Sequence, residues 1–181
     1  MHKPTAKVFW LWGRGVQNVI VFIFFQNLSR LYSSELIFDG HIKYELLKKF
    51  DINKNEIVRY YQSTQSWTSN VEVMGINKCI TKQIINQKNE TLFRDTTCKS
   101  EDNEGKVFYR VGKSLRGGDG AFLDQTKFVS GEGRWKLLEG KTCLLAYSTI
   151  SGDSIEGYLT SKMICEIPMN IFNRIKNYKN D

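Results

Sequence analysis

Residues 106–166 read KVFYRVGKSLRGGDGAFLDQTKFVSGEGRWKLLEGKTCLLAYSTISGDSIEGYLTSKMICE. Glycines interrupt this stretch at short intervals, and the segments between them carry many β-branched and aromatic residues. Strands this short, about ten residues apart, predict an all-β protein, an antiparallel meander that closes into a β-barrel of about eight strands. The expected strands are Lys106–Gly112, Ala121–Val129, Arg134–Leu138, Thr142–Ile150 and Gly157–Glu166.

The residues before this stretch extend the same pattern. Ile57–Trp67 and Thr91–Lys99 read as strands, and Val71–Gln87 reads as a strand in which Gly75 marks a bulge. Ile42–Phe50 fits either a short helix or an irregular strand. After Pro168, apolar side chains recur at helical spacing and predict a short closing helix that contains Ile171, Phe172, Ile175 and Tyr178.

Length and charge indicate one soluble domain. The chain has 181 residues, of which 41% are hydrophobic, enough for a substantial core. Its net charge of +7 lies largely at the N-terminus, because residues 1–34 hold four basic and no acidic side chains. The other 22 basic and 19 acidic residues leave a net charge of only +3, which favours solubility and does not predict nucleic-acid binding.

The N-terminal 34 residues have the order of an export signal. Basic side chains at Lys3, Lys7 and Arg14 precede the apolar run Val19–Phe25, and serines follow it. The run is short for a membrane span, which needs about twenty residues. We therefore expect residues 1–34 to be a signal peptide or an uncleaved membrane anchor and residues 35–181 to be the barrel domain. The remaining alternative is an apolar segment packed on that domain.

Two pairs of cysteines are placed symmetrically about predicted turns. Cys79 and Cys98 are equally far from the Lys88-Asn89 turn, and Cys143 and Cys165 are equally far from Ser154. Antiparallel hairpins turning at these points would bring each pair together, at about 4.5–5.5 Å between Cα atoms, which a disulfide tolerates. We therefore expect two hairpin disulfides and an oxidising compartment, periplasmic or extracellular.

The alternatives for the cysteines are four reduced core residues or a metal site. No two cysteines stand two to four residues apart, and only His2 and His41 could assist them, so the sequence predicts no metal site. The scarcity of histidine also leaves no Ser-His-Asp or Cys-His arrangement. Gly117–Gly120 lacks the Lys-Ser/Thr of a phosphate-binding loop and fits a hairpin corner, so no cofactor is expected.

Aromatic side chains are spread over nearly every predicted strand. In a closed barrel alternate residues point inward, so some of these rings must line the interior, where an eight-stranded barrel has room for packing or one small ligand. With a turn at Gly140, Trp135 would pair with Leu145 and share an inner face with Tyr147. The candidate ligand-binding residues are Tyr109, Trp135 and Tyr147.

One stretch resembles a known family. Gly118-Asp119-Gly120-Ala121-Phe122 and Thr126–Trp135 resemble the Gly-x-Gly…Thr-x-Lys-Phe-x-x-x-x-Gly-x-(aromatic) pattern of allene oxide cyclase-like and dirigent-like proteins, without the glycine often found between Thr126 and Lys127. Those proteins are calycin-type eight-stranded barrels and include cyclases and proteins that steer coupling reactions. The resemblance implies the barrel and an interior pocket, and no catalytic residue is carried over from it.

These patterns together predict an exported, noncatalytic barrel that binds a small apolar or aromatic molecule. A cyclase or isomerase that uses the same pocket is the first alternative, and a secreted protein-interaction module with a filled barrel is the second. Contact with a membrane is expected only through the N-terminal segment.

The cysteine spacing can be tested directly. Proteolysis without prior reduction should release Cys79 linked to Cys98 and Cys143 linked to Cys165, because each hairpin places its two sulfur atoms opposite one another. Mass spectrometry of the linked peptides gives the pairing. Four free thiols, or a bridge between the two hairpins, would contradict it.

Overall fold

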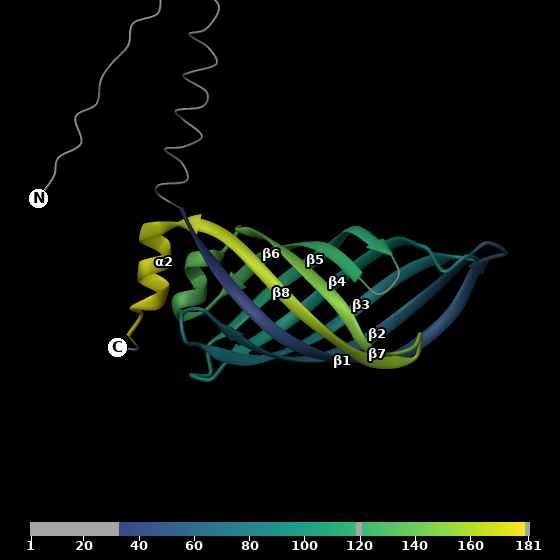
Figure 1. Ribbon diagram of the computed structural model, residues 1–181, viewed down its shortest axis with the longest axis horizontal. Coiled ribbons are helices and arrows are strands. Elements are labelled where there is room, and N and C mark those ends of the chain that lie inside the picture. The colour runs from purple at the N-terminus through teal and green to yellow at the C-terminus, as the bar shows by residue number, and fades with distance from the viewer. Residues whose placement is uncertain (1–32, 119–120, 180–181) are drawn as a thin grey trace, which may run out of the picture. The chain divides into compact units, whose positions relative to one another are not determined.

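A computed structural model describes residues 33–118 and 121–179. Eight antiparallel strands follow one another around a closed barrel, so each strand pairs with its neighbours in the chain (Figure 1). The all-β barrel predicted from the glycine-punctuated stretch is confirmed. The strands are β1 (Ser33–Asn53), β2 (Glu56–Ser69), β3 (Met74–Asn86), β4 (Thr91–Asp102), β5 (Val107–Gly118), β6 (Ala121–Gly131), β7 (Thr142–Gly152) and β8 (Glu156–Pro168).

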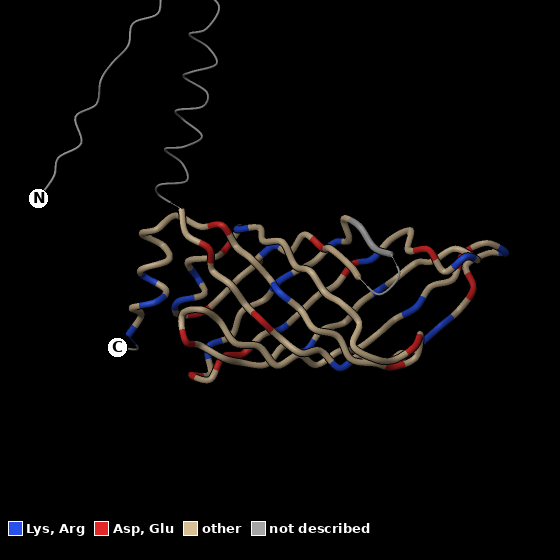
Figure 2. Tube along the Cα trace, viewed as in Figure 1, with Lys and Arg blue, Asp and Glu red and all other residues tan. Residues whose placement is uncertain are grey.

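Alternation along the strands separates the barrel interior from solvent. In β3, for example, Asn77 and Cys79 are buried while Lys78 and Ile80 are exposed. This period of two is the direct consequence of the pleat, which sends successive side chains to opposite faces. Acidic and basic residues are interspersed along the strands and turns (Figure 2).

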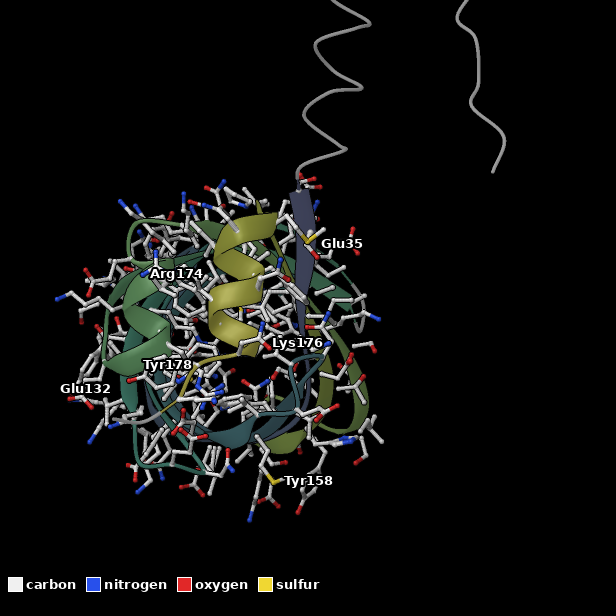
Figure 3. All side chains as sticks on the ribbon, turned by 90° about the vertical axis from the view of Figure 1, so that its left-hand side faces the viewer. Glu35, Glu132, Tyr158, Arg174, Lys176 and Tyr178 are labelled. Atoms are coloured by element: carbon white, nitrogen blue, oxygen red, sulfur yellow. A yellow bond between two sulfur atoms is a disulfide. The ribbon has the colours of Figure 1, made fainter. Side chains whose placement is uncertain are left out.

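One end of the barrel is covered by two short helices. The 3-10 helix η1 (Gly133–Leu138) follows β6, and the helix α2 (Met169–Lys176) follows β8. The spacing after Pro168 predicted α2, although Tyr178, expected within it, lies beyond its end. Figure 3 looks onto this end and shows α2 lying across it beside η1. The β1–β2, β3–β4 and β7–β8 turns lie at the opposite end (Figure 1).

An aromatic cluster fills the barrel under the helices. Trp135 is fully buried, with its ring centre 5.0 Å from that of Phe108 and 5.8 Å from those of Phe38 and Trp67. Its indole N–H donates a hydrogen bond of 2.8 Å to Oδ2 of Asp102, so the one polar atom of the ring is satisfied. The core is therefore concentrated at the end that η1 and α2 cover.

The expected strand Arg134–Leu138 is wrong, because these residues form η1. After β6 the chain turns sharply: Gly133 has a φ of +53°, and a Cβ on Gly131 would lie 2.7 Å from the carbonyl carbon of Trp135. Because of this turn, the Trp135 side chain enters the end of the barrel from η1 and not from a strand. Leu145 consequently pairs with Asp124 and Met163, and the expected pairing of Trp135 with Leu145 does not form.

Two further expectations need correction. Ile42–Phe50 belongs to the 21-residue strand β1, so the helical alternative is wrong. Gly75 does not mark a bulge, since the register runs without a shift on both sides of β3 at this position. The glycine is required by space instead: a Cβ there would lie 2.2 Å from the carbonyl oxygen of Glu101 and 2.5 Å from the Trp67 ring.

Both predicted disulfides are present and account for all four cysteines. Cys79 is bonded to Cys98 and Cys143 to Cys165, with Cα separations of 4.1 and 4.3 Å. All four residues are buried. The two bridges are compatible with an exported protein.

The expected signal peptide or anchor lies outside the described residues, apart from Ser33 and Ser34, which begin β1. Within the part of the chain that is described, no helix has the length and apolar character needed to cross a membrane.

Packing at the covered end predicts a large effect of Trp135→Ala. Deleting the ring leaves a cavity and removes the hydrogen bond to Oδ2 of Asp102, so the free energy of unfolding should fall by about 3–5 kcal/mol in urea denaturation. Tyr109→Ala is the control, since this ring is 43% exposed on the outer face and its loss should cost about 0.5 kcal/mol or less. Equal effects of the two variants would contradict the assignment of Trp135 to the core.

Candidate functional site

The half of the barrel away from α2 encloses a cavity of about 530 Å³. Inward side chains from all eight strands line it, and residues of the β3–β4 and β7–β8 turns surround its mouth. This volume lies within the range of small-molecule sites. Other hollows, of about 490 to 750 Å³, lie along β1–β3 and around α2 and are formed largely by outward-facing side chains.

A polar layer separates the cavity from the aromatic cluster. Its centre is Gln65, whose amide nitrogen donates to Oγ of Ser161 at 2.6 Å. The Gln65 carbonyl oxygen accepts two hydrogen bonds, from Nδ2 of Asn77 at 2.6 Å and from Nη2 of Arg110 at 3.1 Å. These four residues are buried and come from β2, β3, β5 and β8, so the layer ties four strands together.

A second polar group joins β4, β6 and β7. Nη2 of Arg94 lies 2.5 Å from Oδ1 of Asp124, and the Tyr147 hydroxyl donates a hydrogen bond to Oδ2 of the same carboxylate. The Arg94 guanidinium also lies over two rings, 4.4 Å from the centre of Phe122 and 5.1 Å from that of Tyr147. Asp124 has no exposed surface, and both of its oxygens are engaged within the protein.

Burial shifts the acid–base behaviour of this half of the barrel. Burial, together with the negative charge of Asp124, raises the pKa of Tyr147 far above its ordinary value. The phenol is therefore protonated at neutral pH and serves as a hydrogen-bond donor. Burial also lowers the pKa of Arg110 to about 10, which still leaves the guanidinium charged at neutral pH.

Two tyrosines connect the cavity wall to its mouth. The Tyr44 hydroxyl donates to the carbonyl oxygen of Asp153 at 2.6 Å, and the Tyr61 hydroxyl donates to that of Ser154 at 3.1 Å. Burial raises the pKa of both phenols. The β7–β8 turn is thus fastened to β1 and β2.

The three residues predicted to bind a ligand occupy different places. Tyr147 lines the cavity. Trp135 faces the interior as well, but it belongs to the aromatic cluster at the covered end. Tyr109 lies on the outer face of β5, because its neighbours Phe108 and Arg110 point inward, and it is not part of the cavity wall.

Sequence reasoning missed the polar residues of the interior. Gln65, Arg94, Arg110 and Asp124 are all buried, and each stands at the inward position of an alternating strand. The available signal was the alternation itself: in β6 the inward positions read Phe122, Asp124, Thr126 and Phe128. A charged residue within such a series indicates a polar interior, since it shares its face with buried apolar neighbours.

Within the described ranges no cluster of three or more His, Cys, Asp or Glu side chains could hold a metal ion. The chain matches no known protein-family model, and a comparison with characterised proteins gives no match.

The raised pKa of Tyr147 predicts a specific alkaline response. Above about pH 10 the unfolded chain ionises this tyrosine while the folded barrel keeps it protonated. The unfolded state then binds fewer protons, so stability falls as pH rises, by up to about 1.4 kcal/mol per pH unit for this group. Urea denaturation of Tyr147→Phe across this range should show a shallower decline than the unmodified chain. Tyr109→Phe, altered at an exposed ring, should decline like the unmodified chain, and an equal decline in all three would refute the prediction.

Proposed function

We propose that this barrel binds a small, partly apolar molecule in the half of its interior that the aromatic cluster leaves open. The observation that carries the proposal is the cavity of about 530 Å³ enclosed by all eight strands. Aromatic and aliphatic side chains supply much of its wall, among them Tyr61, Phe122, Leu145 and Tyr147. Each Å² of apolar surface that a ligand buries there contributes about 25 cal/mol before the ordering costs of binding.

The wall of the cavity is held in place before any ligand arrives. The Cys79–Cys98 disulfide joins β3 to β4, and both cysteines line the cavity. The Arg94–Asp124–Tyr147 group fixes β4, β6 and β7 on another side. A preformed site loses less conformational entropy when a ligand binds, and this smaller loss favours binding.

Binding without catalysis is favoured by the state of the ionisable groups. An enzyme that cyclises or isomerises its substrate commonly uses a general base with a pKa near neutrality. Tyr147 is instead held protonated, and both Asp124 oxygens are occupied by Arg94 and Tyr147.

A cyclase or isomerase is the second candidate. One observation favours it. Tyr147, whose pKa is strongly raised, lies beside the buried Arg94–Asp124 ion pair at the cavity, and groups with strongly shifted pKa values also occur in active sites. In such an enzyme the Tyr147 hydroxyl would turn from Asp124 to donate its hydrogen bond to a developing oxyanion. A protein-interaction module with a filled barrel is disfavoured by the volume of the cavity.

The proposed setting is an exported protein that belongs with the calycin-type barrels. The two disulfides support an oxidising compartment, and the eight-stranded meander agrees with the fold implied by residues 118–135.

Occupation of the cavity can be measured with phenylnaphthylamine, an uncharged aromatic probe that fluoresces in apolar sites. The chain should bind it saturably with one site per molecule. Ser63→Trp places an indole in the cavity from β2 and should weaken binding by about tenfold or more, because the ring occupies the ligand's volume. Thr64→Trp is the matched control, since Thr64 is exposed on the outer face of the same strand.

If both tryptophan variants bind the probe as the unmodified chain does, the cavity is not the binding site and the proposal fails. If instead only Ser63→Trp weakens binding, native mass spectrometry of the protein from its natural host would identify the physiological ligand by its mass.

A further inference from the structure

Three arginine side chains are buried among the described residues, and only two of them have a carboxylate partner. Arg94 pairs with Asp124 within the barrel, and Arg134 of η1 pairs with Glu104. Arg110, which is 4% exposed, forms no ion pair with any described residue. A buried charge without a counter-ion is costly, so this exception calls for a compensating group.

The contacts of Arg110 within the protein are all to neutral atoms. Nη2 donates to the Gln65 carbonyl oxygen at 3.1 Å, and Nη1 lies 3.4 Å from Sδ of Met163, which is a weak acceptor. Its Nε is buried and has no partner in the described part of the chain. Two of the five N–H donors are thus used, and both acceptors are uncharged.

No carboxylate near the polar layer is free to serve Arg110. Asp124 already binds Arg94 and Tyr147, and the acidic residues at the cavity mouth, Glu90 and Asp153, lie in turns at the far end of the strands. The lowered pKa of Arg110 agrees with this, because burial is the main cause of the shift and the group that opposes it is the phenol of Tyr147, not a carboxylate. The side chain remains charged at neutral pH.

Arg110 is also held in a fixed position at the cavity wall. Gln65 receives hydrogen bonds from both Arg110 and Asn77 and donates one to Ser161, so four strands orient the guanidinium. It is part of the cavity lining, where Leu145 and Tyr147 provide apolar surface. A planar guanidinium fixed in this way matches the two oxygens of a carboxylate or similar oxyanion.

We propose that the ligand of this barrel is an amphipathic anion whose oxyanion group pairs with Arg110 while its apolar part lies against the hydrophobic side of the cavity. The proposal rests on the binding function proposed above and adds the chemical class of the ligand. A singly charged head group is expected, because Arg110 is the buried cation of the cavity wall that has no carboxylate partner among the described residues.

Decanoate and decanol distinguish this proposal, since they share an apolar chain and differ in the charge of the head group. Each is used to displace phenylnaphthylamine from the full chain at neutral pH. Decanoate should displace the probe at a concentration at least about tenfold lower than decanol, because a charge-assisted hydrogen bond in a buried site outweighs the greater hydration of the anion.

Substitution of Arg110 assigns the preference to this residue. Arg110→Met keeps an unbranched side chain in place of the aliphatic stem and removes the guanidinium. It should reduce the preference for decanoate to within about twofold of decanol while the probe itself still binds. Lys127→Met, exposed on the outer face of β6, is the matched control for loss of one positive charge and should keep the preference. Arg110→Lys retains the charge without the planar fork and should show an intermediate preference.

The outcomes separate the two proposals. If phenylnaphthylamine does not bind the unmodified chain, the binding function itself fails. If the probe binds but decanoate and decanol displace it equally, the cavity binds neutral molecules and the role of Arg110 is refuted. A preference for decanoate that survives in Arg110→Met also refutes that role. If Arg110→Met does not fold, Arg110→Lys decides: an unchanged preference in that variant contradicts recognition by the guanidinium fork.

Discussion

Closing eight strands into a barrel removes every sheet edge, but it creates a column of inward side chains that must pack, pair or face water. At the covered end this constraint is met by aromatic packing around Trp135, which η1 inserts into the barrel while α2 lies over it. The apolar core is therefore displaced to one end. Most of the clustered apolar core lies at this end, and the cavity lies in the other half of the barrel.

The polar layer lies where these two halves meet. Burying Gln65, Asn77, Arg110 and Ser161 is tolerable because most of their hydrogen bonds are made within the layer. The Arg94–Asp124 pair balances one buried charge, whereas Arg110 has only neutral partners among the described residues. Arg110 is thus a fixed cation at the boundary between the core and the cavity. A ligand with an apolar body and an anionic group would pair with Arg110 and contact the apolar cavity wall at the same time.

Parts of this arrangement were predictable because they depend on local spacing. The symmetric positions of Cys79 and Cys98 about one turn, and of Cys143 and Cys165 about another, determine hairpin partners whatever the rest of the chain does. The closing helix follows from apolar spacing after Pro168. Arg134–Leu138 was misread because its composition suits a strand, while the fold-back at Gly131 and Gly133 depends on Trp135 finding space between distant strands. Tyr109 was included for its ring alone, although its neighbours Phe108 and Arg110 occupy the inward positions of β5.

By itself, the sequence determined most of the strands and turns, the disulfide pairing and the barrel class, since alternation, turn residues and hairpin symmetry act over a few neighbouring positions. Only the tertiary structure decided which inward residues share a level of the barrel. That level depends on the stagger of all eight strands, a property that no single segment carries. Tyr147 therefore lines the cavity, whereas Trp135 lies in the core. For the same reason Asp124 pairs with Arg94, and Arg110 has no carboxylate partner among the described residues. The candidate site is a product of closure, because its residues come from strands that become neighbours around a common interior only when the barrel is complete.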